Sequence, residues 1–351
     1  MKAMVLHGPG KPFVLEQRPD PTPGPGEAVA RVLTCGAGLT IEHVRAGRTG
    51  ANFPIVIGHE ITGEIVAVGP RSETLPVIEP LKEGDPVTCY FYLLDGEDRW
   101  TRSNRPTIST RVSGHVGRQI DGGYAEYIKL PVQNFIKLPE ELDWRGHPAE
   151  VGVICDAIAT PYKVLRRGRI GPLDTVAVFG AGGGLGLQQV VMCKWARARV
   201  IAVETAQHKF AACRDAGADA VVDASSEDVV AAIRDLTKGA GVDVAVDYVS
   251  STRTLEQATA ALGIGGRLLT LGGAAGKPFT VDPRSMLQKE LELMGSRYCT
   301  RQEVIDSLAL AARGEVWPIV TETYPLEQAE AAHQRLAQGL ITGRAALIIG
   351  A

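Results

Sequence analysis

The residues best suited to chemistry are a glycine-rich turn and one acid near the middle of the chain. The turn runs from Gly180 to Gly186, and Glu204 follows it by about 20 residues. Glycines permit a tight turn and let the backbone approach a pyrophosphate, while the N-terminus of a following helix offers free N–H groups. A carboxylate at this distance can bind both hydroxyls of a ribose and repel a 2′-phosphate. The pattern predicts a dinucleotide site.

The segments around the turn must supply a strand, a helix and a second strand to hold it. Thr175–Phe179 is a short apolar run typical of a buried strand, an apolar helical run follows the turn, and Val200–Glu204 is a second strand that ends in the acid. Because these parts occur together and in order, they are far more specific than glycines alone. The alternative is an ordinary strand–turn–helix corner that binds nothing.

The wider sequence predicts an α/β chain with two styles of structure. Between residues 161 and 295, six strand-like segments alternate with helical ones, as in a doubly wound parallel sheet. Residues 1 to about 150 carry short alternating runs and turn clusters, which favour a small β-barrel. After residue 296 the sequence returns to the first style. We expect edge strands at the N-terminus and near Phe279–Val281.

Composition narrows the classes of function. The 351 residues are 45% hydrophobic and 22% charged, as in a soluble globular protein. The net charge of −3 gives no basic surface for nucleic acid, and no apolar run reaches the roughly 18 residues of a membrane span. Six scattered cysteines and the lack of a signal-peptide core favour the cytoplasm. We expect a small-molecule substrate, and neither nucleic acid nor membrane as a partner.

The chain resembles the medium-chain dehydrogenase/reductase superfamily, specifically its zinc-type alcohol dehydrogenases, over nearly its whole length. The motifs that carry the resemblance are Gly58-His-Glu60, Gly63–Gly69, Asp121–Tyr127, Gly180–Gly186, Gly265-Gly-Arg267 and Gly343-Arg344. The resemblance implies a GroES-like β-barrel catalytic domain at residues 1–157, a Rossmann NAD-binding domain at 158–295 and a return to the catalytic domain at 296–351. It also implies a homodimer or homotetramer, in which the Phe279–Val281 strand could continue the sheet across a two-fold axis.

The resemblance further implies NAD(H) as the cofactor. Glu204 takes the place of the ribose-binding acid, Lys209 that of a lysine on the same ribose, and Arg344 resembles an arginine that reaches the pyrophosphate. Taken alone, a lysine such as Lys209 is more often a solvated helix residue, and its spacing from Glu204 brings the ligand role level with that alternative. No basic residue directly follows Glu204, so NADP(H) is not expected. The expected cofactor contacts are Gly180, Gly182, Gly183, Gly184, Leu185, Gly186, Glu204, Lys209, Leu271 and Arg344.

The family's catalytic zinc site is degenerate in this chain. In the register set by Gly36, Thr40 and His43, Gly38 stands at the position of a cysteine ligand. Ile41 replaces the aspartate that supports the histidine ligand. A strong thiolate ligand and its neighbouring carboxylate are therefore both missing.

Two possible ligands remain in the family's positions. They are His59, with Glu60 beside it, and Asp156, counted back from Tyr162. Zinc in a catalytic site needs three protein ligands and an open position. We expect no metal, although a weak site at His59, Glu60 and Asp156 stays open and Cys35 could join it if its loop rearranged. The alternative role for His59 is packing or a hydrogen bond to Asp156.

The structural zinc lobe of the family has lost all of its ligands here. Its four cysteine positions are occupied by Asp95, Asp98, Thr101 and Ser109. These side chains keep the spacing but lack the soft thiolates that a structural zinc site uses. We expect ordinary packing to hold this lobe, with Trp100 as an anchor.

The remaining side chains suggest a route for a proton. By resemblance, Thr40 contacts the substrate oxygen and His43 carries the proton to solvent, while His59, Glu60 and Asp156 become candidates for acid–base work. We expect an NAD(H)-dependent oxidoreductase that interconverts an alcohol and a carbonyl without catalytic zinc. The alternatives are an NADH-dependent reductase of an activated C=C or C=N bond, and a dinucleotide-binding protein without catalysis.

Overall fold

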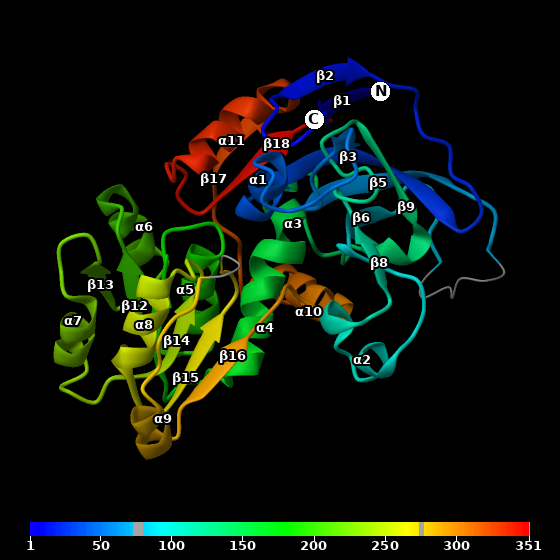
Figure 1. The fold of residues 1–351 in the computed structure, drawn as a ribbon. Coiled ribbons are helices and arrows are strands. Elements are labelled where there is room, and N and C mark those ends of the chain that lie inside the picture. Colours follow the sequence, from blue (N-terminus) through cyan, green and yellow to red (C-terminus); the bar gives the residue numbers. More distant parts are fainter. Residues whose placement is uncertain (73–79, 274–276, 351) are drawn as a thin grey trace. The chain divides into compact units, whose positions relative to one another are not determined.

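The chain folds into two compact units, shown in a computed structural model (Figure 1). The structure describes residues 1–72, 80–273 and 277–350. One unit comprises Met1–Asp156, Thr300–Gly314 and Pro318–Ala351, and the other comprises Ala157–Cys299 and Glu315–Trp317. No helix in these described ranges is long and apolar enough to cross a membrane.

The first unit is built around a seven-stranded sheet with β3 (Glu27–Ala37) near its middle. Its path is β10 (Phe135–Lys137), β6 (Pro86–Cys89), β5 (Ile61–Val68), β3, β18 (Arg344–Ile348) and β17 (Val320–Pro325), with β9 (Tyr127–Pro131) also paired to β3. The pairing of β18 with β3 is antiparallel, and Ala345 lies opposite Ala37. The last strand of the chain therefore brings Arg344 beside Gly38.

Smaller elements complete this unit. They are a three-stranded sheet of β2 (Phe13–Gln17), β1 (Lys2–Leu6) and β4 (Ile55–Val56), the pair β7 (Tyr92–Leu94) and β8 (Val112–His115), and the helices α1 (Leu39–Arg45), α2 (Arg99–Arg102), η1 (Pro106–Ile108), η2 (Val132–Asn134), α3 (Pro148–Val153), α10 (Arg301–Ala312), η5 (Leu326–Gln328) and α11 (Ala329–Ala337). The N-terminal strand β1 lies between β2 and β4, so the expected edge position was wrong. β2 follows β1 directly along the chain and pairs with it across a short turn. The second pairing joins Val5 to Val56, far along the chain, and the pattern of the N-terminal residues does not predict it.

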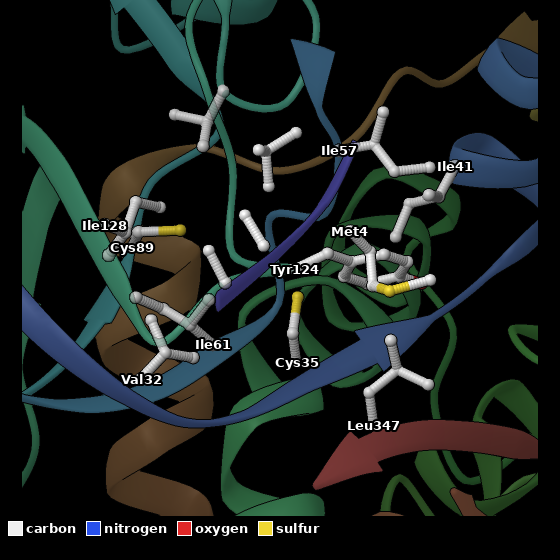
Figure 2. Close-up of a cluster of buried hydrophobic side chains, with 14 of the residues drawn as sticks. Met4, Val32, Cys35, Ile41, Ile57, Ile61, Cys89, Tyr124, Ile128 and Leu347 are labelled. Atoms are coloured by element: carbon white, nitrogen blue, oxygen red, sulfur yellow. The ribbon is translucent and has the colours of Figure 1, made fainter. Parts of the chain in front are cut away.

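The core of this unit lies against β3. Figure 2 shows Cys35, Ile57, Ile61 and Tyr124 packed together, and all four side chains are fully buried. Burial of an aliphatic or aromatic side chain of this size stabilises the fold by about 1.5–3 kcal/mol. The cluster fixes the strands from which the site residues project.

The second unit is a six-stranded parallel sheet with helices. Its strand order is β13 (Ala220–Asp223), β12 (Arg199–Glu204), β11 (Thr175–Phe179), β14 (Val242–Asp247), β15 (Leu262–Thr270) and β16 (Glu292–Gly295). Its helices are α4 (Ala159–Gly168), α5 (Gly186–Trp195), η4 (Gln207–Lys209), α6 (Phe210–Asp215), α7 (Val229–Leu236), α8 (Thr252–Ala261) and α9 (Pro283–Lys289). This order is that of a doubly wound dinucleotide-binding sheet. The predicted α/β class is confirmed.

The expected strand at Phe279–Val281 is absent, and β16 is the edge strand instead. The backbone of the segment bonds to side chains of neighbouring helix α8 rather than to a strand. The Pro278 carbonyl accepts from Thr252, and the Thr280 N–H donates to Glu256. The segment is therefore not a strand in this chain, and the continuation of the sheet across a two-fold axis stays a prediction.

Candidate functional site

The glycine turn of the second unit sits at the carboxyl end of β11. Gly180 has a φ of +72°, in the left-handed region that favours glycine. A Cβ at Gly182 would lie 2.6 Å from the Lys209 Cβ and 3.0 Å from the Glu204 Oε2, and one at Gly186 would overlap the Gly180 carbonyl. The turn is therefore closed to larger residues at these positions. It leads directly into α5, whose N-terminus faces the end of the sheet.

Glu204 ends β12 and is held beside this turn by backbone donors. Its Oε2 accepts from the Gly182 N–H at 2.8 Å, and its Oε1 accepts from Thr205 and Ala206 at 2.8 and 3.1 Å. Lys209 is only 7% exposed, which argues against the alternative of a solvated helix residue. The structure thus gathers Gly182, Glu204 and Lys209 in one place, in a form that suits the adenosine ribose of a dinucleotide.

Leu271 follows β15 at the same edge of this sheet. Phe179, Asp247 and Thr270 lie side by side in neighbouring strands, and the Leu271 N–H donates to the Asp247 carbonyl at 3.4 Å. Ligands bind outside the carboxyl ends of the strands in sheets of this kind. The predicted contacts in this unit therefore share one edge and fit a dinucleotide there.

In the first unit, three predicted acid–base residues meet in a buried cluster. His59 and Glu60 directly precede β5, and Asp156 lies in η3 (Ile154–Ile158), a π-helical turn of the type often found at functional sites. His59 Nε2 is 3.5 Å from Asp156 Oδ2 and 4.0 Å from Glu60 Oε1. Each side chain is at most 5% exposed. Close approach of α3 to β5 makes this possible, since a Cβ at Gly152 would lie 3.1 Å from the Glu60 carbonyl.

Arg344 joins this cluster from β18. Its Nε donates to Glu60 Oε2 at 2.9 Å, its Nη2 donates to Glu60 Oε1, and the same Nη2 is 3.5 Å from Asp156 Oδ2. Burial acts to lower the pKa of Arg344, but the charges of Glu60 and Asp156 outweigh it and raise that pKa. The guanidinium is 4% exposed and directed inward. The expected contact with a pyrophosphate stays a prediction.

The predicted proton-carrying residues lie on α1. Thr40 lines a small cavity of about 10 Å³ together with His59, Ile57 and Phe91. His43 is three residues further on, which places both side chains on one face of the helix. Burial lowers the pKa of His43, and the positive charge of Arg48 acts in the same direction. Both effects favour the neutral imidazole, the form that can accept a proton.

Comparison with known proteins identifies the family. Models of the alcohol dehydrogenase GroES-like domain and of the zinc-binding dehydrogenase match residues 24–140 and 184–313. An NAD-dependent alcohol dehydrogenase of Sulfurisphaera tokodaii is 30% identical over 99% of this chain and 100% of its own. The chain belongs to the zinc-type alcohol dehydrogenases of the medium-chain dehydrogenase/reductase superfamily. This dehydrogenase is thus an oxidoreductase, and the predicted Rossmann and GroES-like fold class is confirmed.

Two further relatives of the dehydrogenase bear on its structure and activity. The crystal structure of the alcohol dehydrogenase from Aeropyrum pernix is 30% identical, with a TM-score of 0.88 over 99% of this chain and 100% of that one. An acryloyl-coenzyme A reductase of Sulfurisphaera tokodaii is 27% identical over 96% of each chain. The fold is therefore shared by relatives named for two different reactions.

The family name implies zinc, but the residues of this dehydrogenase fit that ion poorly. His59, Glu60 and Asp156 each offer one ligand atom, all within 4.8 Å of one another. One imidazole nitrogen and two carboxylate oxygens lack the thiolate that strengthens such sites, and Glu60 is already bonded to a guanidinium. Cys35 does not replace the missing ligand. It is buried in the apolar cluster of Figure 2, where desolvation raises the pKa of its thiol well above the ordinary value.

Hydrogen bonds hold the lobe that would carry structural zinc, in addition to the contacts of Trp100, the residue that we expected to anchor it. Asp98 accepts from the N–H groups of Trp100 and Thr101, and from the N–H and hydroxyl of Thr110. The Arg99 and Arg105 guanidinium carbons lie 4.2 and 5.0 Å from the centroid of the Trp100 ring. One carboxylate thus links both ends of the lobe where the family uses a metal.

One buried network of the dehydrogenase was missed by the sequence analysis. His333 in α11 is fully buried, with Nδ1 2.8 Å from Glu42 Oε2 and Nε2 2.9 Å from the Tyr124 hydroxyl. Arg45 donates to both oxygens of Glu42. This network ties α1, which carries Thr40, to α11. Only the Glu42–Arg45 spacing gave a sequence signal.

Proposed function

We propose that this dehydrogenase transfers hydride between NAD(H) and a small substrate, interconverting an alcohol and a carbonyl without catalytic zinc. The observation that carries the proposal is a buried cluster in which the Arg344 guanidinium contacts Glu60 and Asp156. These two carboxylates and His59 are the residues left in the positions of the family's zinc site. The alcohol dehydrogenase relatives support the reaction class.

The residues of the second unit would hold the cofactor, which supplies the hydride acceptor or donor when bound. The N–H groups of Gly180 to Gly183 are bonded within the protein. Those of Gly184 to Gly186, at the N-terminus of α5, would be offered to a pyrophosphate. Glu204 presents a carboxylate to the ribose and disfavours a 2′-phosphate. Lys209 lies against the same turn and adds a donor for the ribose. These residues together favour NAD(H) over NADP(H).

The residues of the first unit would manage the substrate oxygen and its proton. Charge that develops on a carbonyl oxygen during reduction needs a donor to stabilise it. The Thr40 hydroxyl can donate into the cavity that it shares with His59. His43, on the same face of α1, can pass the proton onward. His59, 3.5 Å from Asp156, is a second acid–base group at this cavity.

A second candidate is reduction of an activated C=C bond, since a similar chain is named acryloyl-coenzyme A reductase. In that reaction the hydride adds to one alkene carbon and the protein delivers a proton to the other. The same Thr40 and His59 could then face the carbonyl that polarises the bond. The cavity does not by itself choose between the two substrates.

The proposal is tested with NADH and a panel of ketones, aldehydes, enones and an enoyl thioester, and with NAD⁺ and alcohols. Turnover of ketones or alcohols supports the first function, and turnover of enones alone supports the second. Thr40→Ala and His59→Ala should lower turnover with little change in NADH affinity. Binding of NADH without turnover of any substrate would favour a binding protein and contradict both.

We also propose a homodimer or homotetramer in a reducing, cytoplasmic setting. The edge strand β16 ends the six-stranded sheet in the described part of the second unit and could pair with a second copy. All six cysteines are free and buried, as suits a compartment that keeps thiols reduced. A monomeric mass by light scattering at micromolar concentration would contradict the oligomer.

A further inference from the structure

We infer that Arg344 is the resident cation of the buried acidic cluster and that it closes this site to divalent metals. The inference deepens the proposed zinc-independent function and rests on it. The resemblance assigns Arg344 to the cofactor pyrophosphate, whereas this inference gives it a second role as the counter-charge of Glu60 and Asp156. Three observations carry it: the charge of the cluster, the space at residue 38 and the register of β18.

The charge argument concerns two carboxylates taken out of water. Glu60 is fully buried and Asp156 is 3% exposed, and both lie within hydrogen-bond or ion-pair reach of one guanidinium. Buried carboxylates require a counter-charge, which a metal ion or a cationic side chain can provide. Arg344 provides it here through two bonds to Glu60 and a longer contact to Asp156. The site therefore has its positive charge without a metal.

The space argument explains why residue 38 is glycine. Gly38 has φ −133° and ψ 167°, an extended conformation that any residue adopts, so the backbone does not require glycine. A Cβ there would lie 2.5 Å from Arg344 Nη2 and 2.6 Å from its Cζ and Nη1. The guanidinium thus fills the volume that the side chain of a cysteine ligand would enter. With the Arg344 guanidinium held inward, residue 38 therefore has no room for a Cβ.

The register argument shows that Arg344 is held in this place. Ala345 pairs with Ala37, and the Arg344 N–H donates to the Ile319 carbonyl at 3.1 Å. The backbone of Arg344 is therefore fixed on both sides. A guanidinium matches a carboxylate with two parallel bonds, which a lysine ammonium does not. The pair with Glu60 is specific to arginine.

Removal of the guanidinium should convert the cluster into a metal site. The Arg344→Met variant leaves His59, Glu60 and Asp156 with their ligand atoms within 4.8 Å and without the competing cation. We expect Co²⁺ and Zn²⁺ to bind this variant at least about tenfold more tightly than the unmodified protein. The double variant Gly38→Cys/Arg344→Met should bind tightest and show a thiolate-to-cobalt absorption band. Gly38→Cys alone should gain little, because the guanidinium still fills the space.

The experiment is a titration of the full chain with Co²⁺ and Zn²⁺ after chelation, followed by calorimetry and visible absorption. Arg335→Met is the matched control, because Arg335 also makes two bonds to one carboxylate, Glu322, away from the cluster. It should not change metal affinity. Adding His59→Ala to Arg344→Met should abolish the gain, which would assign it to this cluster.

A destabilised Arg344→Met variant remains informative. If it unfolds alone, Zn²⁺ or Co²⁺ should restore its unfolding midpoint, because the ion replaces the lost charge. The inference would be overturned if Arg344→Met gains neither metal affinity nor stability in the presence of metal. It would also be overturned if the unmodified protein binds zinc tightly and His59→Ala abolishes that binding. Metal gain by Arg344→Met in a protein that turns over no ketone or enone would leave the inference standing and refute the proposed function.

Discussion

The buried network around Glu42 gives a prediction whose size follows from the structure. Glu42 accepts from Arg45 Nε at 2.7 Å, from Arg45 Nη2 at 3.0 Å and from His333 Nδ1 at 2.8 Å, and its side chain is 4% exposed. Glu42→Gln keeps the shape but removes the charge and one acceptor oxygen. Breaking a buried ion pair costs about 3–5 kcal/mol. We expect about 3 kcal/mol, because Arg45 keeps its contact with Glu330 at 3.1 Å.

The assay is urea unfolding of the full chain at pH 7, followed by fluorescence and circular dichroism. The matched control is Glu97→Gln, which removes the same charge from an exposed ion pair with Arg102. The side chain of Glu97 is 73% exposed and that of Arg102 is 69% exposed. The control should change the free energy of unfolding by less than about 1 kcal/mol. If Glu42→Gln costs no more than Glu97→Gln, the network does not stabilise α1 as argued.

The network also predicts a pH dependence. Burial acts to raise the pKa of Glu42, but hydrogen bonds from His333 and Arg45 outweigh it and lower that pKa below its ordinary 4.5. The stability from ionised Glu42 is therefore present above pH 4.5 and lost as the pH falls further. Burial lowers the pKa of His333 below 6.5, so the unfolded chain takes up a proton first and stability declines as the pH falls below 6.5. His333→Gln should make the decline below pH 6.5 shallower, and the part that remains belongs to groups such as His43, whose pKa burial also lowers.

Two further predictions concern the cofactor. The double variant Glu204→Ser/Thr205→Arg should shift the cofactor preference from NADH toward NADPH, because it removes the repelling carboxylate and adds a phosphate ligand. The preference is measured as the ratio of the two dissociation constants. Tighter binding of NADPH than of NADH by the unmodified protein would contradict this prediction. Gly182→Ala should weaken NADH binding at least about tenfold, because the new Cβ would lie 2.6 Å from the Lys209 Cβ. The control Gly295→Ala should leave NADH affinity unchanged, because no atom lies within 4 Å of its Cβ position. Equal NADH affinities in the two variants would refute the argument.

The dinucleotide half of the chain was predictable because its signals are local. The apolar strand at Thr175–Phe179, the glycine turn and Glu204 follow one another within a single strand–helix–strand unit. Local periodicity therefore predicted both the elements and their order. It failed at Phe279–Val281, where the backbone bonds to Thr252 and Glu256 decide the conformation.

The catalytic half was predictable only in its parts. Resemblance named His59, Asp156 and Arg344, and a hydrogen bond of His59 to Asp156 was one alternative. The contact of Arg344 with Glu60 was not predicted, because 284 residues separate them. The pairing of β18 with β3 brings them together, and no local pattern encodes such a pairing. The same holds for Glu42 and His333, which are 291 residues apart. Sequence patterns predicted which groups were available, and tertiary pairing decided which of them interact.

Zinc content with activity is the most direct test of the central claim. The purified full chain is treated with a mild chelator, its zinc is measured by mass spectrometry, and turnover with NADH and the best substrate of the panel is measured before and after. We predict well below one zinc per chain and unchanged turnover, because one imidazole and two carboxylates beside a guanidinium hold zinc poorly. Stoichiometric zinc, with turnover lost on its removal and restored by zinc alone, would contradict the account.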